Sequence, residues 1–130
     1  MSKINYFEEI EAWKNARVLS QKIYNLTRTG YFSKDFGLKD QIRRAAVSVS
    51  SNIAEGFERN AKNEFLYFLS VAKGSAGEVK SLLYIALDEG YIQKASFDET
   101  SELVNKTSRL IGGMMRYLKK SKIKGARYKT

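Results

Sequence analysis

The chain has 130 residues, a formal net charge of +9, and no histidine, cysteine or proline. Its length suits one domain with a single core. Without cysteine, a disulfide framework and a thiolate metal site are excluded. Without histidine, the commonest general base and the commonest zinc ligand are missing. We therefore expect no metal and no cofactor.

The sequence also bears on where the protein resides. No apolar run reaches the ~18 residues that a membrane helix needs. The first residues lack the apolar stretch of a signal peptide and read MSKINYFEEIE. These features predict a soluble, cytoplasmic protein with no membrane partner.

Small and apolar residues recur at alternating steps of three and four along four segments, the spacing of helices that pack nearly parallel or antiparallel. In chain order these seams are Ala12, Ala16, Leu19, Ile23 and Leu26; Ile42, Ala46, Val49, Ile53 and Gly56; Phe65, Leu69, Ala72, Ala76, Val79, Leu83 and Ala86; and Phe97, Val104, Ile111, Met114 and Leu118. Turn signals at residues 29–37, 59–60 and 89–91 separate them. The pattern predicts an all-α, antiparallel up-and-down four-helix bundle over residues 1–118.

Glycine and other small residues are frequent inside these segments. Glycine costs roughly 0.5–1 kcal/mol in a helix relative to alanine, so its repeated use predicts close approach of helix backbones. The residues concerned are Gly56, Gly74, Gly77, Gly112 and Gly113. A nucleotide-gripping loop at residues 74–77 is the weaker interpretation, because the heptad pattern runs through it and no strand flanks it.

Several short motifs resemble those of a known family: Phe36-Gly37-Leu38, Gln41-Ile42-Arg43-Arg44-Ala45, Ser51-Asn52-Ile53-Ala54-Glu55-Gly56 and Glu64-Phe65. From about residue 12 to residue 118, the chain resembles the four helix bundle family encoded in intervening sequences of bacterial 23S rRNA genes. The resemblance implies a bacterial protein, a homopentameric ring around a central channel, and an association with RNA. Relatives that serve retroelement reverse transcriptases as accessory factors add protein partners to this expectation.

Two serines are expected to shape individual helices. Ser50 stands where the family pattern has proline, and we expect its hydroxyl to bond to the carbonyl four residues earlier, which bends the helix less than proline would. Ser96 is the expected N-cap of the last helix, with Glu99 three residues later completing a capping box.

Some apolar residues lie off the seams: Val18, Tyr24, Val47, Leu66, Tyr67, Leu82 and Tyr84. Two interpretations stay open. They belong to a wide core with partly exposed tyrosines, or they form a subunit interface, where aromatic residues are enriched. The family resemblance favours the second interpretation and a homo-oligomer.

The net charge is concentrated at the C-terminal end. Residues 1–102 contain fourteen acidic and fourteen basic residues, whereas residues 103–130 contain nine basic residues and no acid. Residues 119–130 read KKSKIKGARYKT and predict a basic, flexible tail. Clustered lysine and arginine can neutralise phosphates, and a tyrosine can stack on an unpaired base. The alternative is a solubilising tail that also complements the helix dipole.

The candidate nucleic-acid contacts are therefore Arg43, Arg44, Arg109, Arg116, Lys119, Lys120, Lys122, Lys124, Arg127, Tyr128 and Lys129. Arg43 and Arg44 have an alternative role, which is pairing with acids of a neighbouring helix or subunit.

Asn52 and Glu55 lie three apart and share a helix face. A buried amide and carboxylate need partners, which Arg43, Arg44 or Arg59 could supply across an interface. We expect a structural polar clasp here; a catalytic carboxylate is the weaker alternative.

Motifs of common enzyme classes are absent from the sequence: there is no Walker loop, no dinucleotide fingerprint and no Glu-x-x-His pair. Together with the basic C-terminal segment, the family resemblance then implies a non-catalytic, oligomeric protein that associates with RNA. The alternative is a protein–protein interaction scaffold, or accessory module, that does not bind nucleic acid.

Overall fold

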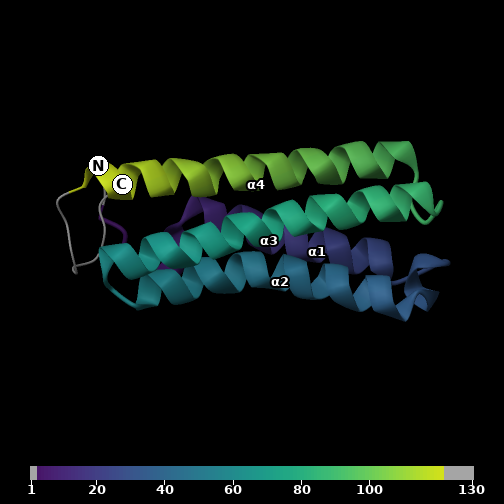
Figure 1. Cartoon of the computed structure of the whole chain (residues 1–130), viewed down its shortest axis with the longest axis horizontal. Helices are drawn as coiled ribbons and strands as arrows, with labels where there is room; N and C mark the ends of the chain where they lie inside the picture. The colour runs from purple at the N-terminus through teal and green to yellow at the C-terminus, as the bar shows by residue number, and fades with distance from the viewer. Residues whose placement is uncertain (1–2, 122–130) are drawn as a thin grey trace.

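The computed structural model describes residues 3–121, which form four long helices, two short 3-10 turns and no strand. The long helices are α1 (Glu11–Thr27), α2 (Phe36–Glu58), α3 (Lys62–Asp88) and α4 (Lys94–Lys120), and the turns are η1 (Phe7–Glu9) and η2 (Phe32–Lys34). The four helices lie side by side with their long axes aligned, and short connections reverse the chain at each end (Figure 1). The all-α, four-helix fold expected from the sequence is confirmed.

The helices form a closed arrangement in which each has two neighbours. α1 packs against α2 and α4, and α3 packs against the same two helices. α2 and α4 therefore occupy diagonal corners of the bundle. This arrangement separates the basic residues of α2 from those of α4, although the sequence suggested one shared role for both groups.

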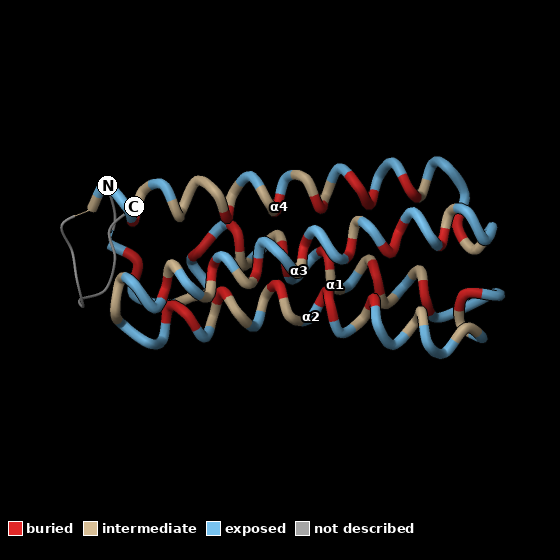
Figure 2. The backbone as a smooth tube through the Cα atoms, viewed as in Figure 1, coloured by how far each residue is buried: buried red, intermediate tan, exposed pale blue. Residues whose placement is uncertain are grey.

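The core consists mainly of the residues expected from the helical seams. All seam residues of α2 and α3 are buried, and in the other two helices only Leu26 and Met114 are half-buried. Buried segments face the interior all along the bundle (Figure 2). Leu82 is also buried, at 5% exposure, which supports the wide-core interpretation at that position. The most exposed of the other off-seam residues are Val18, Val47, Tyr67 and Tyr84.

Close backbone approach occurs at one helical glycine. A Cβ atom added at Gly56 would lie 2.6 Å from Cβ of Phe68 and 3.1 Å from Cδ1 of Phe65, so α2 and α3 meet here without room for a methyl group. The same expectation is wrong for Gly74 and Gly77, because both are exposed and a Cβ there would meet nothing within 4 Å. These two glycines lie on the solvent face of α3.

The expected N-cap of α4 is also wrong. α4 begins at Lys94, and Gln93 is the extended residue before it, so Ser96 already lies inside the first turn. The backbone carbonyl of Ser96 accepts a hydrogen bond from Thr100 Oγ1 at 2.7 Å. Glu99, the other member of the expected capping box, accepts from Lys22 of α1 at 3.1 Å. A short turn through Gly90, with φ of 74°, allows the helix to start earlier than the capping motif suggested.

Helix α2 runs without interruption through the position where the family pattern has proline. Ser50 Oγ donates to the carbonyl of Val47, three residues earlier, at 3.2 Å. The expected bond to the fourth preceding carbonyl is therefore wrong for Ser50. Ser51 makes a bond of that kind instead, donating to the same Val47 carbonyl at 2.9 Å.

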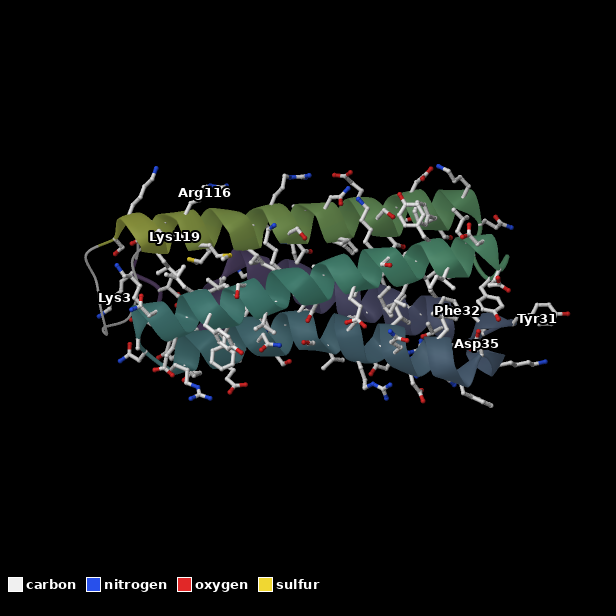
Figure 3. The ribbon with its side chains drawn as sticks, in the orientation of Figure 1. Lys3, Tyr31, Phe32, Asp35, Arg116 and Lys119 are labelled. Carbon is white, nitrogen blue, oxygen red and sulfur yellow. The ribbon has the colours of Figure 1, made fainter. Side chains whose placement is uncertain are left out.

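The end of the bundle that holds η2 is tied together by Asp35 (Figure 3). Asp35 Oδ1 accepts from the backbone N–H of Leu38 and caps α2, at 3.1 Å. Asp35 Oδ2 accepts from the Tyr91 hydroxyl at 2.9 Å, and the Tyr91 ring stacks on Phe32 with centroids 5.4 Å apart. The hydrogen bond to Asp35, assisted by partial burial, raises the pKa of Tyr91. One carboxylate thus joins the α3–α4 connection to the start of α2.

Candidate nucleic-acid interface

The C-terminal half of α4 carries a row of exposed cations. The exposed basic residues are Lys106, Arg109, Arg116, Lys119 and Lys120. Arg116 and Lys119 lie near the C-terminal end of α4 (Figure 3). The remaining candidates from the sequence lie outside the described residues: Lys122, Lys124, Arg127, Tyr128 and Lys129.

A groove of about 250 Å³ runs between α3 and α4 beside these cations, and its lining residues are Lys73, Ser108, Arg109, Gly112 and Arg116. Three of these five residues are cationic and none is acidic. Gly112 lies between cationic side chains of α3 and α4. A Cβ atom at Gly112 would be 3.4 Å from Nη1 of Arg116 and 3.8 Å from Cε of Lys73. Two cationic side chains from different helices therefore converge above a residue that has no side chain.

Within the described part of the chain, only one of the three groove cations has an acidic partner. Arg109 Nη2 donates to Glu102 Oε1 at 3.3 Å, and both side chains are about two-thirds exposed, at 66% and 69%. Such an exposed pair contributes little to stability and is readily exchanged for another anion. Lys73 and Arg116 have no hydrogen bond or ion pair with any residue in the range 3–121.

Arg43 of α2 already has neighbours within the bundle. Its Nε donates to Thr27 Oγ1 at 2.8 Å, and its guanidinium group lies 4.4 Å from the centre of the Tyr24 ring. Arg43 thus connects α2 to the last turns of α1. Arg44 is exposed and lines a shallow hollow that also contains Asp40. Since α2 and α4 lie diagonally opposite, the structure does not bring these arginines together with those of α4.

Asn52 and Glu55 have separate partners rather than shared ones. Asn52 Nδ2 donates to the carbonyl and to Oγ of Ser48 at 2.7 and 2.8 Å, and the hydroxyls of Ser48 and Ser75 are 2.8 Å apart. Asn52 therefore belongs to a polar link between α2 and α3. Glu55 is 54% exposed and pairs with Arg59 of the same helix at 2.8 Å, a bond that raises the pKa of Arg59.

Two further acidic residues, Glu9 and Asp98, also have structural partners. Glu9 Oε1 accepts from the backbone N–H groups of Asn5 and Tyr6 at 2.7 and 2.9 Å, which lowers the pKa of Glu9. Asp98 pairs with Lys94 one turn earlier at 2.6 Å. Residues 3–121 contain no group of three or more acidic or other ligating side chains that could hold a metal ion. No helix in that range is long and apolar enough to cross a membrane.

The sequence model of a family described as 23S rRNA-intervening sequence protein matches residues 8–113. The chain belongs to this family. It is similar to the crystal structure of a protein with unknown function from the S23 ribosomal protein family of Bacteroides thetaiotaomicron VPI-5482. The TM-score is 0.75 with 19% sequence identity, over 81% of this chain and 95% of that chain, which shows a common fold. Among curated proteins, none matches the sequence.

The 23S rRNA-intervening sequence family match covers only part of the basic surface. It includes Lys73, Arg109 and Gly112 but ends before Arg116. Lys73 is not among the cations that the sequence pattern indicated. The sequence does contain an indication of its position. Lys73 and Lys80 lie one heptad apart, and each directly follows a buried seam residue, Ala72 or Val79. A residue in that position flanks the seam and borders the groove to the next helix.

Proposed function

We propose that this member of the 23S rRNA-intervening sequence family is a non-catalytic protein that associates with RNA through the α3–α4 side of its bundle. The observation that carries the proposal is the charge distribution: residues 103–130 hold nine basic residues and no acid, while residues 1–102 are neutral overall. Lysine and arginine clustered in this way neutralise phosphates and release counterions, which supplies sequence-independent affinity.

The contacts within the bundle support the α3–α4 side over the α2 surface. Lys73 and Arg116 have no acidic partner among the described residues, whereas Arg43 is held by Thr27 and Tyr24. An arginine that must leave existing contacts gains less from binding a phosphate. The proposed interface therefore consists of the groove cations and residues 119–130, without Arg43 and Arg44.

The proposal includes a homo-oligomer, with five subunits by family resemblance. Its support comes from large apolar side chains that remain exposed in a single chain, among them Val18, Val47, Tyr67 and Tyr84, which are each at least 43% exposed. A ring would repeat the basic surface and raise the effective concentration of weak phosphate contacts. Analytical ultracentrifugation at micromolar concentration tests this part, and a monomer would refute it.

The same exposed apolar residues favour a second candidate, a protein-binding scaffold without nucleic-acid contact. The two candidates differ in salt dependence. Contacts with RNA phosphates give a log affinity that falls linearly with log salt, whereas apolar docking does not.

The test is the affinity for a fluorescent single-stranded RNA, measured by anisotropy across a series of salt concentrations. The intact chain is compared with a variant in which all six cations of residues 119–130 are changed to glutamine, which keeps the chain length. We expect a steep slope for the intact chain and, for the variant, a slope shallower by roughly 0.7 for each RNA phosphate that it no longer neutralises. Equal weak binding by both, without a slope, would remove the support for RNA and leave the scaffold.

A further inference from the structure

Arginine and lysine side chains normally separate from one another or pair with acids, because like charges repel. In the α3–α4 groove, Lys73 and Arg116 lie close together without pairing with an acid among residues 3–121. Arg116 Nη1 and Lys73 Cε both lie within 4 Å of the position that a Cβ atom of Gly112 would take. Among the described residues no acid lines the groove, and Glu102 reaches only Arg109 from outside it.

The remaining lining atoms also suit an anion. The half-buried Ser108 contributes a hydroxyl that has no hydrogen-bond partner among residues 3–121. Arg116 and Arg109 present planar guanidinium groups, whose paired N–H donors fit the oxygen atoms of a phosphate. Lys73 adds a compact charge from the opposite wall. Gly112 leaves the floor open, so an anion could approach the helix more closely than any side chain would permit.

We propose that this groove is a discrete phosphate-binding site, which holds one phosphate group between Lys73 of α3 and Arg109 and Arg116 of α4. Naming the RNA backbone as the source of that phosphate rests on the proposed function. The site differs from the general basic surface because its affinity depends on the shape of the groove floor. A substitution that keeps every charge but fills the floor therefore weakens binding.

The variant that tests this is Gly112→Leu. Its nearest neighbours are the flexible ends of Arg116 and Lys73, and leucine is a better helix former than glycine, so the fold is expected to remain intact. The matched control is Gly74→Leu, since Gly74 is exposed on α3 with nothing within 4 Å. A second pair compares Lys73→Gln with Lys34→Gln. Each removes one charge, but the exposed Lys34 lies in η2, outside the proposed interface, and does not line the groove.

Affinity for the same fluorescent RNA is measured for all four variants. We expect Gly112→Leu and Lys73→Gln each to weaken binding about 10-fold, the effect of removing one charged hydrogen bond. Gly74→Leu and Lys34→Gln should stay within about 2-fold of the unmodified chain, because the first changes no charge and the second removes a charge outside the interface, which contributes only to the screened field. If all four variants bind alike while the intact chain retains its salt slope, the groove is not a site and the proposed function stands.

A second measurement separates failure of the site from failure of the function. Inorganic phosphate is titrated into the ¹⁵N-labelled protein at constant ionic strength. Amide shifts that saturate, are confined to residues around Ser108 and Gly112, and disappear in Gly112→Leu support the site even if RNA does not bind. Shifts that are spread over all exposed cations, or that persist in Gly112→Leu, overturn the proposal.

Discussion

Alanine at two glycines of the same fold is expected to change stability in opposite directions. Gly56→Ala should destabilise the bundle, because the new Cβ would lie 2.6 Å from Phe68 Cβ and 3.1 Å from Phe65 Cδ1. The Cβ of Phe68 is attached directly to the backbone, so no rotamer change can move it away. α2 and α3 must separate instead. Gly77→Ala meets nothing within 4 Å and should stabilise the chain.

The expected sizes follow from two opposing contributions. Overpacking a core contact costs about 1–3 kcal/mol, and replacing glycine by alanine inside a helix returns about 1 kcal/mol. The contact at Gly56 is only 2.6 Å and involves an atom that cannot rotate away, so the upper part of the overpacking range applies and we expect a net loss of about 1–2 kcal/mol for Gly56→Ala. For Gly77→Ala only the helix contribution remains, and we expect a gain of about 0.5–1 kcal/mol.

Equilibrium urea unfolding followed by far-UV circular dichroism measures both values. The slope m should stay unchanged, so that the shift in midpoint reports stability alone. Thermal unfolding should move in the same directions, by roughly 3–5 °C per kcal/mol for a domain of this size. A Gly56→Ala variant as stable as the unmodified chain, or a shift of both variants in the same direction, would contradict the packing contact at Gly56.

Two further substitutions test polar contacts of the bundle. Ser48→Ala should lower the free energy of unfolding by about 1–3 kcal/mol, because it removes the hydroxyl that contacts both Asn52 and Ser75 and leaves these half-buried groups with one partner fewer. An unchanged urea midpoint would show that the α2–α3 link contributes nothing. Tyr91→Phe should be less stable than the unmodified chain below pH 10.0, the ordinary tyrosine pKa. The hydrogen bond to Asp35 raises the pKa of Tyr91 in the folded state. The extra stability of the unmodified chain over Tyr91→Phe should therefore shrink as the pH rises above 10.0. A stability difference between the two chains that stays constant as the pH passes well above the ordinary tyrosine pKa would contradict the assignment.

The helical seams were predictable because burial in a bundle repeats with the helix period. Ile53 and Leu83, for example, are fully buried, because the helix period places them on the same face as the other seam residues of their helices. The spacing says less about which glycines are packing contacts. Gly56 lies on the α2 seam and Gly77 beside the α3 seam, but the 2.6 Å approach at Gly56 is set by the position of Phe68 on the neighbouring helix. That position depends on the offset between α2 and α3, which a single-helix pattern does not contain.

The candidate site was predictable in part. The charge on α4 is visible in the sequence, and the cations of its C-terminal half are exposed as expected. From the sequence, Arg43 and Arg44 of α2 were grouped with the cations of α4. The order of the helices along the chain does not show which two helices lie diagonally opposite in the bundle, and α2 and α4 do. Lys73 was missed because it meets α4 residues that are far from it in the sequence, and residues 66–79 contain no other basic residue.

The most direct measurement of the central claim compares two double variants that each remove two positive charges. One is Arg109→Gln with Arg116→Gln on α4, and the other is Arg43→Gln with Arg44→Gln on α2. If RNA lies on the α3–α4 side, the α4 pair should reduce the steepness of the salt dependence by roughly 1–2 in log affinity per log salt. The α2 pair should leave it unchanged. A larger loss from the α2 pair, or equal losses from both pairs, would contradict the account.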